Sequence, residues 1–189
     1  MVLSRLAEET KTTIVSAVKG TDDVLSALRG AVKNQITGAF KDVSDVATAG
    51  MDSVADVVSG AVSSAGDIGS SITDVAKGAL GAAVSAVSDA GEDVFMAVRR
   101  ASRGAIKGAA ETGADVGQVA VSAVEGAIDT ADKLGKNTTE FTKEAVIGVV
   151  KAADEIGSEV GNTVRSALMS AASLPREVIK SAISGEKES

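Results

Sequence analysis

The chain has 189 residues, a net charge of −7 and 44% hydrophobic residues, with three Phe and no Trp, Tyr, His or Cys. Without His or Cys it lacks the imidazole and thiolate groups that most zinc and iron–sulfur sites and many nucleophile–base pairs use, so we expect no enzyme and no cofactor. The acidic balance disfavours a nucleic-acid partner, and the hydrophobic content disfavours a disordered chain.

An 11-residue period runs from Val2 to Ile183, and its apolar positions almost never carry charge. Eleven residues make three turns of about 3.67 residues each, so the period keeps one apolar stripe on one side of a helix. We therefore predict an all-α fold in which one very long hendecad-repeat helix, or a few long segments, assembles into a multi-helix coiled coil, stalk or tube. The uncharged arc spans about 160°, more than a single partner helix covers, which favours a homo-oligomer.

The large apolar residues of this stripe are the predicted oligomer interface. They are Val32, Val43, Val54, Ile68, Ile72, Val87, Val94, Val98, Val116, Val124, Val149, Ile156, Val160 and Val164.

Two series of glycines recur every 22 residues along the stripe. The first is Gly38, Gly60, Gly104, Gly126 and Gly148, and the second is Gly69, Gly91, Gly113, Gly135 and Gly157. A glycine inside a helix costs about 1 kcal/mol relative to Ala, so we predict that both series are offset by close helix contacts. The alternative is that they mark turns, since residues 134–138 (LGKNT) resemble a helix stop followed by an N-cap. We favour a continuous helix because the 11-residue phase holds across every glycine.

Charged residues are sorted beside the stripe, with mostly cations along one edge and mostly carboxylates behind them. The densest basic cluster is Arg99, Arg100, Arg103 and Lys107. Acidic residues flank this cluster in the sequence, so we interpret it as a solvated helix face with local salt bridges.

Near the C-terminus, Pro175 interrupts the pattern, and a proline removes a helix hydrogen bond and clashes with the preceding turn. We predict a continuous repeat helix over residues 1–173, a short helix over 174–184 after a kink, and a polar tail over 185–189. The longest uncharged runs are too short to span a bilayer, and no signal peptide is recognised, so we expect a cytoplasmic protein, with membrane or granule association left open.

The period, with phrases such as residues 60–66 (GAVSSAG) and 148–154 (GVVKAAD), resembles the repeats of α-synuclein, perilipins, late-embryogenesis proteins and exchangeable apolipoproteins. That resemblance implies an amphipathic helix that coats lipid surfaces. The chain departs from synuclein-like lipid binders because its cations lie on only one edge of the stripe. In architecture it also resembles long helical stalk or scaffold subunits that gather and tether an enzyme complex.

Two functions follow from one long helix. The first is a non-enzymatic scaffold, a self-associating stalk, tube or filament whose Ala, Val and Gly interior tethers a partner complex or holds a lipid- or quinone-like molecule. The alternative is an amphipathic helix coating a membrane, lipid droplet or polyester granule.

Overall fold

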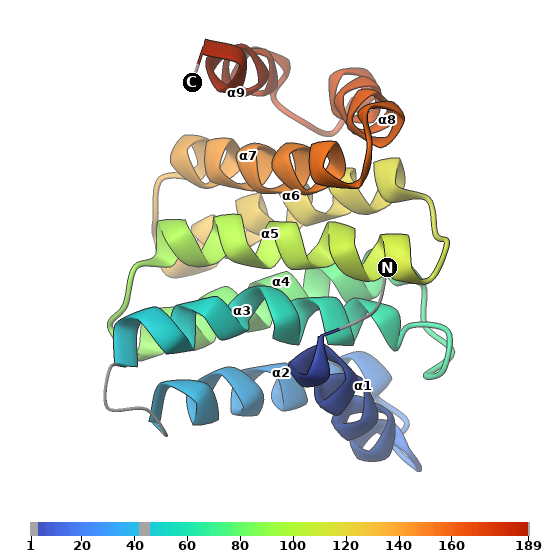
Figure 1. The fold of residues 1–189 in the computed structure, drawn as a ribbon. Helices are drawn as coiled ribbons and strands as arrows, with labels where there is room; N and C mark the ends of the chain where they lie inside the picture. Colours follow the sequence, from blue (N-terminus) through green and yellow to red (C-terminus); the bar gives the residue numbers. More distant parts are fainter. Residues whose placement is uncertain (1–3, 42–45, 189) are drawn as a thin grey trace.

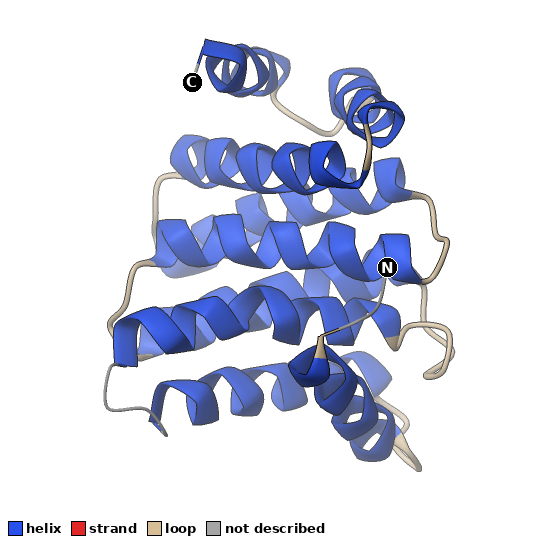
Figure 2. Ribbon diagram, in the orientation of Figure 1, coloured by secondary structure: helices blue, strands red, loops and turns tan. Residues whose placement is uncertain are grey.

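A computed structural model describes residues 4–41 and 46–188, which form nine α-helices (Figures 1 and 2). They are α1 (Arg5–Val18), α2 (Val24–Lys41), α3 (Val46–Ser63), α4 (Ile72–Asp89), α5 (Val94–Glu111), α6 (Val116–Leu134), α7 (Thr138–Ile156), α8 (Ser158–Ser170) and α9 (Arg176–Glu188).

The helices stack in two layers. Each inner helix packs against its neighbours in the chain and also against the helices two positions before and after it. The odd-numbered helices therefore form one layer, with α3, α5 and α7 in front in Figure 1, and α4 and α6 lie behind them. This arrangement is a solenoid-like helical repeat whose unit is an antiparallel helix pair.

The prediction of one very long helix that assembles into a coiled coil, stalk or tube is wrong. From α4 to α7, each 22-residue period consists of a helix of 18 or 19 residues followed by a turn. Such a helix is about 27 Å long at 1.5 Å per residue, far shorter than the predicted rod. Two periods, or 44 residues, make one helix pair, and the chain folds back on itself at every turn.

Most of the second glycine series ends helices. Gly69, Gly91, Gly113 and Gly135 all have left-handed backbone conformations, with φ between 63° and 75°. After Gly91, Gly113 and Gly135 the next residue's N–H closes the helix end, as where Lys136 N–H donates to the Ala131 carbonyl at 2.8 Å, and after Gly69 the Ser70 N–H donates to Ala65 in the turn that follows α3. This is the Schellman arrangement, which glycine adopts without the steric cost that a Cβ brings.

An N-cap side chain lies two residues after each of these glycines, and the next helix begins at the following residue. Asp93, Asp115 and Asn137 accept hydrogen bonds from backbone N–H groups in the first turns of α5, α6 and α7, and Ser71 does so for α4. The pattern of a glycine followed two residues later by Asp, Asn or Ser therefore encodes both the stop of one helix and the start of the next.

We expect Gly135→Ala to lower the free energy of unfolding by about 1 kcal/mol, the cost of a left-handed conformation for a residue with a Cβ. No atom lies within 4 Å of a Cβ added at Gly135, so the loss comes from the backbone alone. Gly157→Ala is the matched control, because Gly157 has an extended φ of 167° and equally open surroundings. Urea unfolding checks both variants, and equal losses at the two positions would contradict the assignment of Gly135 to a strained turn.

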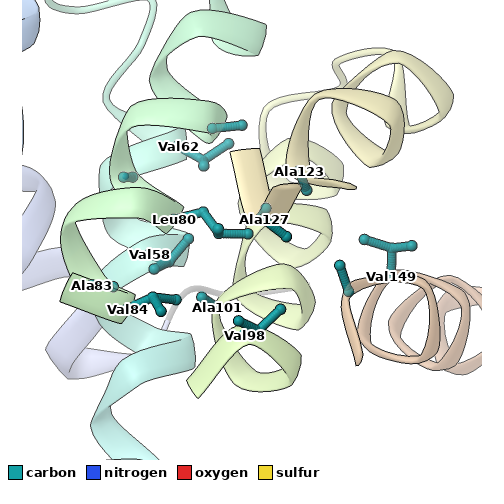
Figure 3. Close-up of a cluster of buried hydrophobic side chains, with 14 of the residues drawn as sticks. Val58, Val62, Leu80, Ala83, Val84, Val98, Ala101, Ala123, Ala127 and Val149 are labelled. Atoms are coloured by element: carbon teal, nitrogen blue, oxygen red, sulfur yellow. The ribbon is translucent and has the colours of Figure 1, made fainter. Parts of the chain in front are cut away.

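The apolar arc is wide because neighbours within the same chain cover it on several sides. In Figure 3 the fully buried side chains of Val58, Leu80, Val98, Ala127 and Val149 meet from α3, α4, α5, α6 and α7. Helix α5, for example, packs against α3 and α7 in its own layer and against α4 and α6 in the other. One folded chain thus buries the stripe that the sequence led us to assign to an oligomer.

The C-terminal part departs from the regular repeat. Gly157 separates α7 from α8, and the predicted kink at Pro175 lies between α8 and α9, where the Pro175 carbonyl accepts the Ile179 N–H at 3.1 Å. Residues 1–173, predicted as a single helix, hold α1 to α8. Helix α9 runs on to Glu188 and so includes most of the predicted 185–189 tail.

Candidate functional site

The residues predicted to form an oligomer interface lie in the interior of one chain. Val43 is outside the described residues. The buried ones are Val32, Val54, Val87, Val94, Val98, Val124, Val149 and Val164. The partly buried ones, packed against the same core, are Ile68, Ile72, Val116, Ile156 and Val160.

The glycines predicted at close helix contacts have three different surroundings. A Cβ at Gly60, Gly104 or Gly148 would overlap a backbone carbonyl oxygen of the helix two positions earlier, and one at Gly126 would lie 3.2 Å from the Lys77 backbone. Gly38 lies inside α2 with nothing within 4 Å of an added Cβ. Gly69, Gly91, Gly113, Gly135 and Gly157 lie between helices, with equally open surroundings.

Most ion pairs among the described residues connect different helices, although Arg5–Glu9 and Glu140–Lys143 each lie within one helix. Lys33 Nζ in α2 lies 2.7 Å from Asp89 at the end of α4, and Arg99 Nε in α5 donates to Glu144 Oε2 in α7 at 2.6 Å. The cation edge of one helix therefore meets the carboxylates of the next helix in the same layer. The local salt bridges expected for the basic cluster are replaced by these longer-range pairs.

A groove of about 390 Å³ crosses the outer face of the even layer. Its floor is formed by small residues of α4, including Gly78, Gly81 and Ser85, and its walls come from α2 and α6. The charged residues that line it are Arg29 and Lys33 from α2, Asp74 and Lys77 from α4, and Asp129 and Lys133 from α6. The groove thus offers a shallow, small-residue floor between walls that carry both signs of charge.

An ionic cluster fixes one edge of this groove. Glu125 in α6 accepts a hydrogen bond from Ser173 Oγ at 2.6 Å, and its other oxygen lies 3.0 Å from Lys77 Nζ. Burial raises the pKa of Glu125, but the hydrogen bonds from Ser173 and Lys77 outweigh it, so the net pKa lies below the ordinary value. The hydrogen bond with Glu125 raises the pKa of Lys77, so it favours the charged form of both side chains. The cluster ties α4, α6 and the segment between α8 and α9 together.

We expect Glu125→Gln to destabilise the protein at pH 7 and to lose this effect in acid. Because the folded-state pKa of Glu125 is lowered, its contribution is present above the unfolded pKa of about 4.3 and disappears as the pH falls through the folded value. Urea midpoints at pH 7 and near pH 3 check this, with the exposed Asp132→Asn as control. If the urea midpoints of Glu125→Gln and of the unsubstituted protein differ by the same amount at both pH values, the proposed role of the carboxylate is contradicted.

Residues 4–41 and 46–188 lack two other kinds of site. No helix there is long and apolar enough to cross a membrane. In the same ranges, no three His, Cys, Asp or Glu side chains gather in a way that could hold a metal ion.

Comparisons with known proteins support the fold alone. No protein-family model and no curated protein matches the chain. Among solved structures, it is similar to a de novo designed helical repeat protein, DHR7, with 17% sequence identity, a TM-score of 0.52 and coverage of 97% of this chain and 95% of that one. The expected relation to synuclein-like, perilipin-like and apolipoprotein-like repeats is therefore wrong, as is the analogy to long helical stalks. The chain has the fold of a helical repeat protein.

Proposed function

We propose that this chain is a non-enzymatic binding scaffold that holds a segment of a partner protein in the groove across α2, α4 and α6. The observation that carries the proposal is the pair of helical glycines in its lining, Gly30 and Gly78. A Cβ at Gly30 would meet nothing within 4 Å, and one at Gly78 would make only ordinary contacts, the shortest 3.7 Å to Arg29 Cγ. Packing within the chain does not require either glycine.

Each of these glycines costs about 1 kcal/mol of helix propensity. At Gly104 and Gly148 that cost is offset by the close approach of another helix of the same chain. At Gly30 and Gly78 the close approach of a second chain would offset it, and helical repeat arrays commonly use their continuous faces for such binding. Mixed charges on the groove walls would then orient the bound segment.

The ends of the array also favour a finite scaffold over a filament. Helix α1 exposes Glu8, Thr12 and Thr13, and α8 exposes Asn162 and Ser166. Polar outer faces on terminal helices are the usual way in which a repeat array stops. The stalk and the lipid coat both depended on an apolar stripe left uncovered by its own chain, so neither is proposed.

Peptide selection on the purified protein tests the proposal. Ser85→Trp places a large side chain in the groove, whereas Asn34→Trp adds the same bulk at an exposed position of α2 that does not line it. We expect peptides selected from a random library on the unsubstituted protein to lose binding to Ser85→Trp and to keep it with Asn34→Trp. A selection in which no enriched peptide loses binding to Ser85→Trp while keeping it with Asn34→Trp would refute the groove as a binding site.

A further inference from the structure

The opposite layer carries a surface of a different character. Two hollows open on this side, one across α3, α5 and α7 and one across α5, α7 and α9. Their combined lining holds six of the chain's 19 Lys and Arg residues but only two of its 26 carboxylates. The six are Arg99, Arg100, Arg103, Lys107, Lys143 and Lys151. The lining of the two hollows is thus mainly cationic, with Glu144 and Glu155 beside it as ion-pair partners of two of the arginines.

A single line of side chains organises this face. Met96, Arg100, Arg103 and Lys107 follow one another at spacings of four, three and four residues along α5, so they lie on one side of the helix. From Met96 to Lys107 the line covers about 16 Å, the length of three helical turns. Figure 1 shows α5 between α3 and α7 at the front of the molecule.

Three arginines of this face are already held in place. Arg99, Arg100 and Arg103 pair with Glu144, Asp52 and Glu155 at 2.6, 3.1 and 2.6 Å respectively. A guanidinium has five N–H donors, and each of these pairs uses one of them, so every arginine keeps donors for a second acceptor. The pairs therefore orient the arginines without consuming their hydrogen-bonding capacity.

Two lysines of the face have no ion-pair partner among the described side chains. Lys107 and Lys151 both line the hollow between α3, α5 and α7, and neither has a carboxylate partner in the part of the chain that the structure describes. Among the described side chains, their ammonium groups therefore supply positive charge that no ion pair compensates.

The same line begins with exposed apolar side chains. Phe95 is 38% exposed and Met96 is 44% exposed, and they are adjacent at the start of α5. At the matching positions of α7, 44 residues later, the chain has exposed Thr139 and Glu140. The repeat thus accepts polar residues at both positions. Phe95 packs edge-to-face against Phe141 of α7, with ring centroids 5.5 Å apart, so the exposed Met96 beside it is the feature particular to this helix.

We propose that this face of α5 binds an acidic segment of a partner protein, with an apolar side chain of that segment seated on Met96 and Phe95. Carboxylates farther along the segment pair with Arg100, Lys107 and Lys151. Guanidinium groups match the geometry of carboxylates, and methionine adapts its shape to an apolar neighbour. This surface is separate from the α2–α4–α6 groove, so it adds a second binding face to the proposed scaffold.

An acidic protein segment fits the face better than nucleic acid or a lipid surface. Among the described residues of this face, two large hydrophobic side chains are exposed, too few for insertion into a bilayer but suited to one or two apolar anchors. The aspartates among the basic residues, Asp52 and Asp56, break the continuous positive track that a phosphate backbone needs.

The test uses the full chain and a peptide library built from Glu, Asp, Leu, Phe and Ser. We expect the unsubstituted protein to enrich binders whose affinity falls about tenfold or more with Met96→Ser and with the double variant Lys107→Gln/Lys151→Gln. The double variant Lys19→Gln/Lys136→Gln removes the same charge from exposed positions elsewhere and should bind as before. Ser85→Trp should also bind as before, which separates this surface from the α2–α4–α6 groove. Circular dichroism melting verifies that each variant is folded.

Three results would overturn the proposal. The first is a selection that enriches no acidic binder, and the second is a set of binders indifferent to Met96→Ser and Lys107→Gln/Lys151→Gln. The third is tighter binding of single-stranded RNA or of vesicles containing phosphatidylserine that depends on the same residues. A failed selection on the groove with a successful one here would overturn the groove and leave this surface standing.

Discussion

Gly104→Ala is expected to lower the free energy of unfolding by about 2 kcal/mol, although alanine is the better helix former. An added Cβ at Gly104 would overlap the Ala55 carbonyl oxygen and lie 3.0 Å from the Ala55 carbonyl carbon, so α5 and α3 must separate. Overpacking of this kind costs about 3 kcal/mol, and the gain in helix propensity of about 1 kcal/mol offsets only part of it. Urea unfolding followed by circular dichroism measures the difference.

The neighbouring repeat provides a second test of the same contact. A Cβ at Gly148 would overlap the Arg99 carbonyl oxygen, so Gly148→Ala should cost a similar amount, and the double variant should lose about 4 kcal/mol because the two contacts lie at different helix interfaces. Gly78→Ala is the control, since its Cβ has room and should stabilise the helix by up to about 1 kcal/mol. If all three changes stabilise the protein, the glycines are not sites of close helix approach.

The helical character of the chain and much of its core could be predicted from the sequence. The uncharged positions of the 11-residue period identified the buried face of each helix, because any helix packed on several neighbours must keep charge off a wide arc. Val54, Val98, Val124 and Val149 were selected in this way and are fully buried. The pattern could not show whether the helices that cover this face belong to the same chain or to another copy.

The turns were considered as an alternative and rejected, because the phase of the pattern survives them. If the repeat grew by duplication, each copy carried its turn along with its helix, so the spacing of 22 residues persists across every break. Continuity of phase therefore says nothing about continuity of the helix. The informative signal was the residue two positions after the glycines of the second series, as at Asp93, Asp115 and Asn137, which are the N-caps of α5, α6 and α7.

The surfaces were harder to foresee than the core. The basic cluster of α5 was recognised in the sequence, but its carboxylate partners Asp52, Glu144 and Glu155 lie 45 to 52 positions away in the chain, at distances set by the stacking of helix pairs. The floor of the even-layer groove was equally hidden, because Gly78 belongs to neither of the 22-residue glycine series. Both features depend on the tertiary arrangement rather than on local pattern.

Duplicating residues 94–137 in place is expected to give a longer protein that still unfolds cooperatively. The copy adds one α5–α6 pair, so its first helix enters the odd layer and its second enters the even layer. The Gly104 of the copy then faces the backbone of the original α5, as Gly148 does in the natural chain. The copied α5 packs on the original α5 in the place that α7 occupies in the natural chain. At that contact the copy has Ala97 where α7 has the fully buried Phe141, which leaves a cavity costing about 3 kcal/mol.

Duplicating residues 116–137 alone should be far more harmful, because one extra helix moves every later helix into the wrong layer. Helix α7 would then pack in the even layer, where the partners of Gly148 and of Glu144 are absent. We expect loss of the cooperative transition in calorimetry and an expanded particle in sedimentation, whereas the 44-residue duplication keeps both properties. A continuous 11-residue rod would tolerate the two insertions equally, since each is a multiple of eleven, so equal tolerance would contradict the two-layer array. Both insertions preserve the 11-residue phase of the apolar positions. They differ only in whether they add one helix or a pair of helices.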